Sequence, residues 1–551
     1  MDALFDRHRS LLGKAVAALG DRGFWTPFPE VPSGKIYGET ARRDGLSAYE
    51  ARLGAAFALE GHPESRRVGG EASPWGAALD VSYPAADAAG LVDASTAAGG
   101  AWAAATPETR VGLLVEALTR LNAMSFEMAN AVMHTTGQAF PMAFQAGGPH
   151  AQDRGLEAVA MAWSEMSRAP ASAIWEKPQG KAAPIVIEKH WRLVPRGVAL
   201  VIGCQTFPTW NSYPGLFASL ATGNTVIVKP HPGAILPLAL TVATLRDLLA
   251  EQGLPRDVVL LAADSPDAPI TQALVRHPSV AIVDYTGSSA FGAWVRENAG
   301  GAQVYTEEAG VNAIVIVRTD AFAAMCANIA FSLSLYSGQM CTAPQDIFVP
   351  RGGIETDAGH KSFDEVAAGI AAAVDALLAD PARAADVCGA IANPATLARI
   401  AAARSLGRIV RDSAPLDAEV RSATPLIVAV DAADEAAYGE ERFGPIAFVV
   451  AVEDAADGIA RAAALARRKG AITAALYDTD EAGIRRAADA FASAGVNLSV
   501  NLSGNIFVNQ SAAFSDFHVT GINPSGNASL TDAAFVAGRF ARAMWRRPVA
   551  A

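Results

Sequence analysis

Short apolar runs alternate with stretches of helical spacing in the middle of the chain. The apolar runs cover 198–202, 225–228, 258–261 and 280–283. Apolar residues recur at helical spacing between them, in 213–221, 235–251 and 268–277. Repeated alternation of a buried strand and a helix predicts a doubly wound α/β domain with a parallel sheet. Sheets of this kind bind ligands at the carboxyl ends of their strands.

Helical spacing also dominates the first part of the chain. One helix is expected at 4–19, inside an N-terminal extension of residues 1–74 that shows no recognisable chemistry. The Thr-Pro-Glu sequence at 106–108 supplies an N-cap, a first-turn proline and a carboxylate that suits the helix dipole. It predicts one long helix running towards His134, and a further helix is expected at 153–167.

Two further segments have the composition of strands. The apolar stretches 185–187 and 191–194 predict a strand pair, with charged residues 188–190 between the two strands. Residues 540–549 also have a strand-like composition. These pieces could form a protruding ribbon that pairs with another subunit, or a simple edge hairpin, and the sequence leaves both open.

A polar loop carries a candidate nucleophile. Residues 320–336 predict a helix and residues 347–349 a short strand, so the loop 337–344 presents Cys341 between two buried elements. A cysteine taken alone is at least as often an inert small apolar residue. The other cysteines have apolar or helical neighbours and are expected to be inert: Cys204, Cys326 and Cys388.

The fourth apolar run leads into a glycine-containing turn. The segment 284–292 holds Gly287 and Gly292 and opens the next helix, where backbone N–H groups and the helix dipole suit a phosphate. It matches neither the dinucleotide fingerprint nor the P-loop pattern. On its own the turn is weak evidence, and a plain strand-to-helix connection explains it equally well.

Composition limits the classes of partner. The 551 residues exceed one ordinary core, so two or three domains are expected. Acidic residues outnumber basic ones by 56 to 44, which argues against nucleic acid or an anionic membrane as the main partner. Scattered cysteines and the absence of a signal-peptide pattern predict a cytoplasmic protein, and no metal site is predicted.

The motifs fall in a recognisable order along the chain. They are Trp210-Asn211, Lys229-Pro230, the turn with Gly287 and Gly292, Glu307, the Cys341 loop, and the segment 441–445. This set resembles the aldehyde dehydrogenase superfamily over residues 75–530. The His-Pro pair at 231–232, the surroundings of Asn211 and Glu307, and the leading extension are most similar to phenylacetic acid degradation proteins of the PaaN type.

The resemblance implies a fold and a domain organisation. A doubly wound cofactor domain is expected at 75–306, interrupted by an oligomerisation hairpin at 179–194. An α/β catalytic domain is expected at 307–508. Residues 509–551 should return to the cofactor domain and to a small β ribbon, and a homodimer or homotetramer is implied.

The same resemblance assigns the catalytic residues. Cys341 becomes the nucleophile, since a thiolate attacks carbonyls readily and later leaves well. The Asn211 amide and the Cys341 backbone N–H resemble the oxyanion hole. Glu307 matches the general base that activates water to hydrolyse the thioester.

The cofactor-binding residues follow in the same way. Lys229, with His231 beside it, is placed at the adenosine ribose. The Gly287-Ser288 turn is placed at the pyrophosphate, and Glu441 and Phe443 at the nicotinamide side. Trp210 and Gly292 complete the expected set. A glutamate common in NAD-dependent relatives is replaced by Pro232, so NADP is the predicted cofactor, with NAD as the alternative.

The implied reaction is the oxidation of an aldehyde to a carboxylate through a cysteine thiohemiacetal and thioester. The expected substrate is the ring-opened, CoA-linked semialdehyde of phenylacetate degradation, with a separate enoyl-CoA hydratase as a possible partner. Another aldehyde dehydrogenase, including a CoA-acylating one, and an inactive binding protein of the same fold are the alternatives. Ala309, Val311 and Asp346 depart from the family pattern and predict a different substrate access route.

Overall fold

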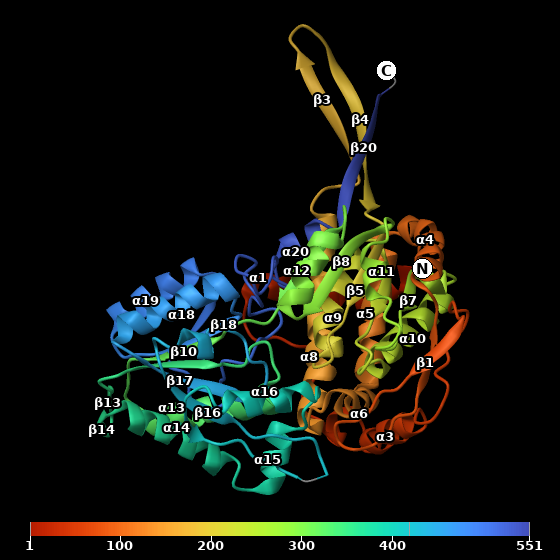
Figure 1. The fold of residues 1–551 in the computed structure, drawn as a ribbon. Coiled ribbons are helices and arrows are strands. Elements are labelled where there is room, and N and C mark those ends of the chain that lie inside the picture. The colour runs from red at the N-terminus through yellow and green to blue at the C-terminus, as the bar shows by residue number, and fades with distance from the viewer. Residues whose placement is uncertain (1, 418, 550–551) are drawn as a thin grey trace.

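The computed structural model describes residues 2–417 and 419–549. Two α/β bodies lie beside one another, and a long three-stranded ribbon projects from one of them (Figure 1). No helix in the two described ranges combines the length and apolar content needed to cross a bilayer.

The first body is built on a five-stranded parallel sheet in the order β7-β6-β5-β8-β9. Its strands are β5 (Val198–Ile202), β6 (Thr225–Lys229), β7 (Val259–Leu261), β8 (Val280–Gly287) and β9 (Gln303–Glu308). The intervening helices are α9 (Pro208–Ala221), α10 (Leu236–Glu251), η1 (Arg256–Val258), α11 (Thr271–Val275) and α12 (Ser289–Asn298). Alternate residues of β5 enter different apolar cores, Val201 one and Leu200 the other, so both faces of the sheet are covered. The predicted doubly wound α/β architecture is confirmed.

The second body contains a seven-stranded sheet in the order β15-β16-β17-β12-β10-β18-β19, in which only β15 is antiparallel to its neighbour. Its strands are β10 (Ala313–Ile316), β12 (Asp346–Pro350), β15 (Arg408–Arg411), β16 (Leu426–Asp431), β17 (Ile446–Val452), β18 (Thr473–Tyr477) and β19 (Asn497–Val500). Its helices are α13 (Phe322–Ser334), η2 (Leu335–Gly338), α14 (Phe363–Leu377), α15 (Pro381–Cys388), α16 (Ala395–Ala403), α17 (Glu435–Tyr438), α18 (Ala455–Lys469) and α19 (Glu481–Ser493). A small sheet joins β11 (Arg318–Thr319), β13 (Ile354–Thr356) and β14 (Gly359–Lys361).

The N-terminal segment is part of the first body. Its elements are α1 (Asp2–Asp21), α2 (Gly34–Tyr37), α3 (Ala41–Glu50), β1 (Arg66–Gly69), β2 (Ser82–Ala85), α4 (Ala88–Ala104), α5 (Pro107–Ala123), α6 (Ser125–Thr136), α7 (Phe140–Gly147) and α8 (Pro149–Ser167). Leu4, Phe5 and Leu12 of α1 are buried in the same apolar core as α5 and α8. The extension therefore packs as an integral layer of this body.

One predicted helix is divided in the structure. The single helix expected from 106 towards His134 is wrong, because the chain leaves helical geometry at Met124, where ψ is 11°. The Met124 N–H caps α5 by donating to the carbonyl of Arg120, and the Ser125 hydroxyl donates to the carbonyl of Asn122. The non-helical backbone at Met124 therefore separates α5 from α6.

The projecting ribbon is formed by β3 (Ser172–Gln179), β4 (Ala182–Pro195) and β20 (Phe540–Pro548), and α20 (Ala533–Ala537) precedes it. The two separate strands expected around 188–190 are wrong, because β4 is continuous. The antiparallel pairing with β20 runs unbroken from Pro195 to Ile187 and includes the charged residues. The predicted terminal strand is confirmed, and it pairs within its own chain.

A buried ion pair ties the C-terminal segment to the first body. Arg539 is fully buried, and its Nη1 and Nη2 donate to the two carboxylate oxygens of Asp284 at 2.8 and 2.6 Å. Nη1 also donates to the Ser219 hydroxyl at 2.7 Å. Such a bidentate pair fixes geometry strongly, and removal of one partner leaves a buried charge without compensation.

We therefore expect Asp284→Ala to lower the free energy of unfolding by about 3–5 kcal/mol. Denaturant-induced unfolding measures this loss. Asp364→Ala is the matched control, since it breaks an exposed pair with Arg408 and should cost about 0–1 kcal/mol. Equal losses in the two variants would contradict the role given to the buried pair.

Candidate active site

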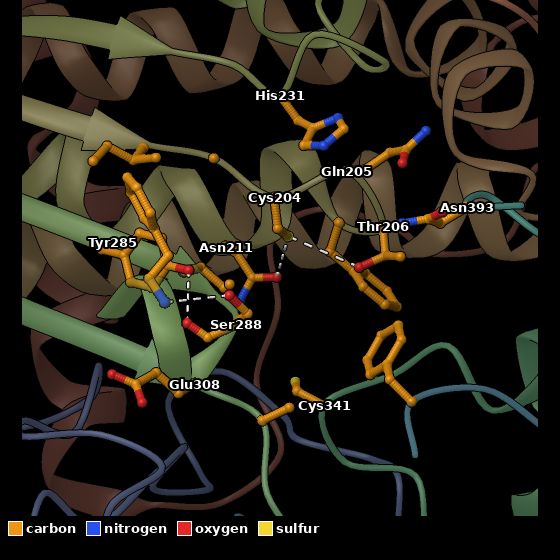
Figure 2. Close-up of a pocket in the computed structure, with 18 of the residues that line it drawn as sticks. Cys204, Gln205, Thr206, Asn211, His231, Tyr285, Ser288, Glu308, Cys341 and Asn393 are labelled. Atoms are coloured by element: carbon orange, nitrogen blue, oxygen red, sulfur yellow. Dashed lines mark hydrogen bonds between the residues drawn. The ribbon is translucent and has the colours of Figure 1, made fainter. Parts of the chain in front are cut away.

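A cavity of about 800 Å³ lies at the carboxyl ends of β5, β6 and β8, facing the loop that follows η2. All predicted site residues except Trp210 and Gly292 line it: Asn211, Lys229, His231, Gly287, Ser288, Glu307, Cys341, Glu441 and Phe443. In Figure 2, His231 lies at one end of the cavity and Cys341 at the other, with Cys204 and Asn211 between them. The sequence motifs thus converge on one elongated cavity.

The loop before Cys341 has an unusual backbone. Tyr336 and Ser337 both adopt left-handed conformations, with φ of 50° and 49°, and Gly338 follows with φ of 63°. The Ser337 hydroxyl is buried and contacts the carbonyls of Cys388 and Ala423 at 3.1 and 2.8 Å. Left-handed geometry is costly for residues with a side chain, so these contacts hold the turn in place.

Close backbone packing explains the glycine of this loop. A Cβ on Gly338 would lie 2.4 Å from the carbonyl oxygen of Gly444. Gln339 bonds to the backbone of Ala390 and Ala392, and Asn312 donates to the carbonyl of Cys341 at 2.8 Å. The Cys341 backbone is therefore held by fixed partners on both sides.

Cys341 faces the carboxylate of Glu307, at the end of β9. The Cys341 Sγ donates to Glu307 Oε1 over 3.7 Å, and Glu307 is almost completely buried. Burial and the nearby Glu307 carboxylate raise the pKa of the Cys341 thiol well above its ordinary value. In this conformation the thiol keeps its proton, and Glu307 is the group placed to accept it.

Asn211 lies on α9 beside the same carboxylate. Its Nδ2 donates to Glu307 Oε1 at 2.9 Å, and its Oδ1 accepts from Cys204 Sγ at 3.6 Å. The amide that was expected to bind an oxyanion is therefore engaged by Glu307 here. Cys204, which was expected to be inert, lies in the cavity wall. Cys326 and Cys388, which were also expected to be inert, are buried in the core.

His518 is a third neighbour of Glu307 that the sequence did not reveal. Its Nε2 lies 2.9 Å from Glu307 Oε1, and the imidazole is buried. Trp210 packs edge-on against it, with ring centroids 4.7 Å apart, so Trp210 supports the catalytic side and does not line the cavity. A lone histidine in an irregular segment carries no spacing that marks it as functional.

At the opposite end of the cavity, Lys229 is not a free cation. Its Nζ lies 2.7 Å from Asp264 Oδ1, and both side chains are buried. His231 is an exposed residue, but the protein around its imidazole and the Lys229 ammonium lower its pKa to about 4, so it is uncharged at neutral pH. Asp264 was missed because it follows a strand outside any recognised motif.

The predicted phosphate turn begins α12. The Ser288 hydroxyl caps this helix by accepting from the N–H of Phe291 at 3.4 Å, and a Cβ on Gly287 would lie 2.4 Å from the Tyr285 hydroxyl. Gly292 serves another purpose, because a Cβ there would lie 2.0 Å from Glu308 Oε1. Glu308 in turn pairs with Arg296, so Gly292 gives room to this ion pair.

The remaining wall comes from the second body. Glu441 and Phe443 line the cavity, and Arg399 Nε donates to the Phe443 carbonyl at 3.0 Å. An elongated cavity with a helix N-terminus at its side and polar groups at both ends fits a dinucleotide. Lys229, Ser288 and Glu441 are the residues that would hold it.

Two of the departures from the family pattern lie away from the cavity. Asp346 is completely buried at the start of β12 and accepts from Gln345 Nε2 at 3.1 Å, and burial raises its pKa well above the ordinary value. Val311 is buried in the apolar core of the second body, and only Ala309 lines the cavity. The expectation that Asp346 and Val311 reshape substrate access is therefore wrong, since both have structural positions.

Several known proteins are similar to this chain in sequence and fold. A crystal structure described as an NAD-dependent aldehyde dehydrogenase from Burkholderia multivorans is 54% identical, with a TM-score of 0.98. The match covers 100% of this chain and 99% of that one. A variant of 1-pyrroline-5-carboxylate dehydrogenase from Thermus thermophilus shares the fold at 20% identity and a TM-score of 0.76, covering 96% of this chain and 99% of that chain.

Among curated proteins, N-succinylglutamate 5-semialdehyde dehydrogenase from Burkholderia multivorans is 28% identical over 424 residues. This alignment covers 75% of the chain and 80% of that relative. The sequence pattern described as "Aldehyde dehydrogenase family" matches residues 80–532. The chain therefore belongs to the aldehyde dehydrogenase family.

Proposed function

We propose that this aldehyde dehydrogenase oxidises a semialdehyde to the corresponding carboxylate with NAD, through a thioester on Cys341. The observation that carries the proposal is the 3.7 Å separation of Cys341 Sγ and Glu307 Oε1. A nucleophile and a base within reach of each other, at one end of an elongated cavity, are what covalent aldehyde oxidation requires.

The first half of the reaction forms the covalent adduct. Glu307 accepts the thiol proton while Cys341 Sγ attacks the carbonyl carbon and the carbonyl oxygen becomes an oxyanion. Asn211 Nδ2 can donate to that oxyanion once it is released from Glu307, and one such donor is typically worth about 3 kcal/mol. A bound nicotinamide would supply the hydride acceptor, and loss of the hydride would leave a thioester on Cys341.

The second half releases the acid. Glu307 first gives the thiol proton to solvent and then takes a proton from water, and the resulting hydroxide equivalent attacks the thioester carbon. The C–S bond breaks, and the Cys341 thiolate takes the proton back from Glu307. A CoA-acylating enzyme would instead pass the acyl group to a thiol. The buried Glu307 next to Cys341 supports hydrolysis over that alternative and over an inactive protein.

The cofactor assignment rests on charge. NADP was predicted from the sequence, but Asp264 cancels the positive charge that Lys229 would offer to a 2′-phosphate, and His231 adds none. The 54% identical Burkholderia structure is described as NAD-dependent. These observations support NAD, and NADP stays the alternative.

The substrate class rests on the relatives. The curated relatives act on N-succinylglutamate 5-semialdehyde, as their names state. The resemblance to PaaN-type proteins favours a CoA-linked semialdehyde from phenylacetate. Both are aldehydes on a chain that carries a second acyl group, so we propose a semialdehyde of that type.

Replacement of Glu307 by Gln separates the two halves of the reaction. The amide cannot accept a proton from water, so thioester hydrolysis should fail. The variant also lacks the group that takes the thiol proton in the first half. Loss of the negative charge lowers the pKa of the Cys341 thiol, however, so the thiol can lose its proton to solvent and the first half should survive at a lower rate. Rapid mixing should give about one equivalent of NADH per active subunit and then a stall. Steady turnover at the wild-type rate would show that another group is the base.

Replacement of Asp264 by Asn tests the cofactor assignment. Removal of this charge should raise the ratio of kcat/KM for NADP to that for NAD by about tenfold. Steady-state kinetics with both cofactors measures the ratio. Asp267→Asn, on the exposed part of the same connection, is the control and should leave the ratio unchanged. A wild-type protein that already prefers NADP would overturn the proposal.

A substrate panel tests the aldehyde class. We expect higher kcat/KM for semialdehydes with a second acyl group than for simple alkanals of equal length. A CoA-linked semialdehyde that exceeds N-succinylglutamate semialdehyde would favour the phenylacetate assignment, and the reverse order would favour the function of the curated relatives. Equal activity on alkanals would contradict the proposed class.

A further inference from the structure

We infer that His518 is a positioning residue that fixes the general base, by holding one oxygen of Glu307 and leaving the other free for proton transfer. The inference rests on the proposed role of Glu307 in thioester hydrolysis. Glu307 Oε1 accepts from His518 Nε2 and from Asn211 Nδ2, both at 2.9 Å. Glu307 Oε2 is buried and has no hydrogen-bond partner within the described ranges.

The hydrogen-bond partners of His518 determine which imidazole nitrogen points a hydrogen at Glu307. Arg154 Nη2 donates to the Ser511 hydroxyl oxygen at 2.7 Å, because a guanidinium can only donate. The Ser511 hydroxyl hydrogen is then available for His518 Nδ1, 3.2 Å away. A carboxylate oxygen can only accept, so an imidazole hydrogen lies on Nε2 and points to Glu307.

Packing keeps the imidazole in this orientation. His518 is only 2% exposed, and the Trp210 ring meets it edge-on at 75°. The Arg154 guanidinium lies 5.1 Å from the Trp210 ring and is paired with Glu157 at 2.8 Å. The ionisable groups around the imidazole are Glu307 and Cys341 on one side and the Arg154–Glu157 pair on the other.

The loop that carries Ser511 and His518 is anchored by the N-terminal segment. Phe514, in the middle of this loop, meets the Trp25 ring edge-on with centroids 4.8 Å apart. The Ser515 hydroxyl donates to the carbonyl of Arg22 at 3.0 Å. The N-terminal segment of the first body thus supports the loop that places His518 on Glu307.

These contacts have a chemical consequence. Two donors on Oε1 fix the orientation of the Glu307 carboxylate and leave Oε2 as the oxygen that can take a proton from water. Cys341 and Cys204 are the other titratable groups close to Glu307. Loss of His518 should therefore weaken the base in thioester hydrolysis more than the nucleophile.

The test uses His518→Phe and His518→Gln in the full chain with NAD and an accepted aldehyde. The phenylalanine variant should keep the NADH burst but hydrolyse the acyl enzyme about tenfold or more slowly. The glutamine variant retains an N–H donor and should recover most of the hydrolysis rate.

Controls separate positioning from folding and from the proposed function itself. His150→Phe alters an exposed histidine paired with Glu30 and should match wild type. If His518→Phe does not fold, Ser511→Ala should also slow hydrolysis of the acyl enzyme, but by a smaller factor. A chelator is included, because Glu307, Cys341 and His518 place donor atoms within 4.8 Å of one another and could capture zinc.

The outcomes are distinct. Absence of NADH formation by the wild type with every aldehyde tested would overturn the proposed function, whatever His518 does. A wild-type hydrolysis rate in His518→Phe would overturn the positioning role. If the NADH burst and the hydrolysis rate fall equally in both the Phe and the Gln variants, His518 has only a structural role.

Discussion

One carboxylate oxygen organises the catalytic end of this protein. Glu307 Oε1 is shared by the thiol of Cys341, the amide of Asn211 and the imidazole of His518. These groups come from a loop of the second body, from α9 and from the segment after β19, so three distant parts of the chain must be in register. The arrangement keeps the thiol protonated at rest and leaves Asn211 occupied. Both groups become available only when Glu307 releases them.

The scaffold around this point is rigid for physical reasons. The cysteine loop runs through three successive left-handed residues, and Gly338 approaches another backbone too closely for a side chain. The buried Arg539–Asp284 pair ties the C-terminal segment to the first sheet. The aromatic contact of Trp25 with Phe514 ties the N-terminal segment to the loop of His518. Both ends of the chain thus contribute to the geometry of the site.

Sequence reasoning succeeded where local pattern determines structure. Buried parallel strands read as apolar runs, and the ordered motifs indicated a cavity that the structure assembles from Cys341, Glu307 and Asn211. It failed at a local backbone break and where distant contacts decide. The backbone leaves helical geometry at Met124, which no residue pattern announces, and β4 is continuous because β20 pairs along it. His518 and Asp264 gain their importance from neighbours far away in the chain, which no spacing along the sequence records.

The interaction between Glu307 and Cys341 is open to direct measurement. The rate of Cys341 alkylation by iodoacetamide can be followed against pH, with peptide mapping to separate it from Cys204. Burial and the Glu307 carboxylate raise the pKa of this thiol, so the alkylation midpoint of the wild type should lie above that of an ordinary cysteine. In Glu307→Gln the midpoint should fall, because the negative charge is gone. A midpoint that stays the same or rises would contradict the central place given to Glu307.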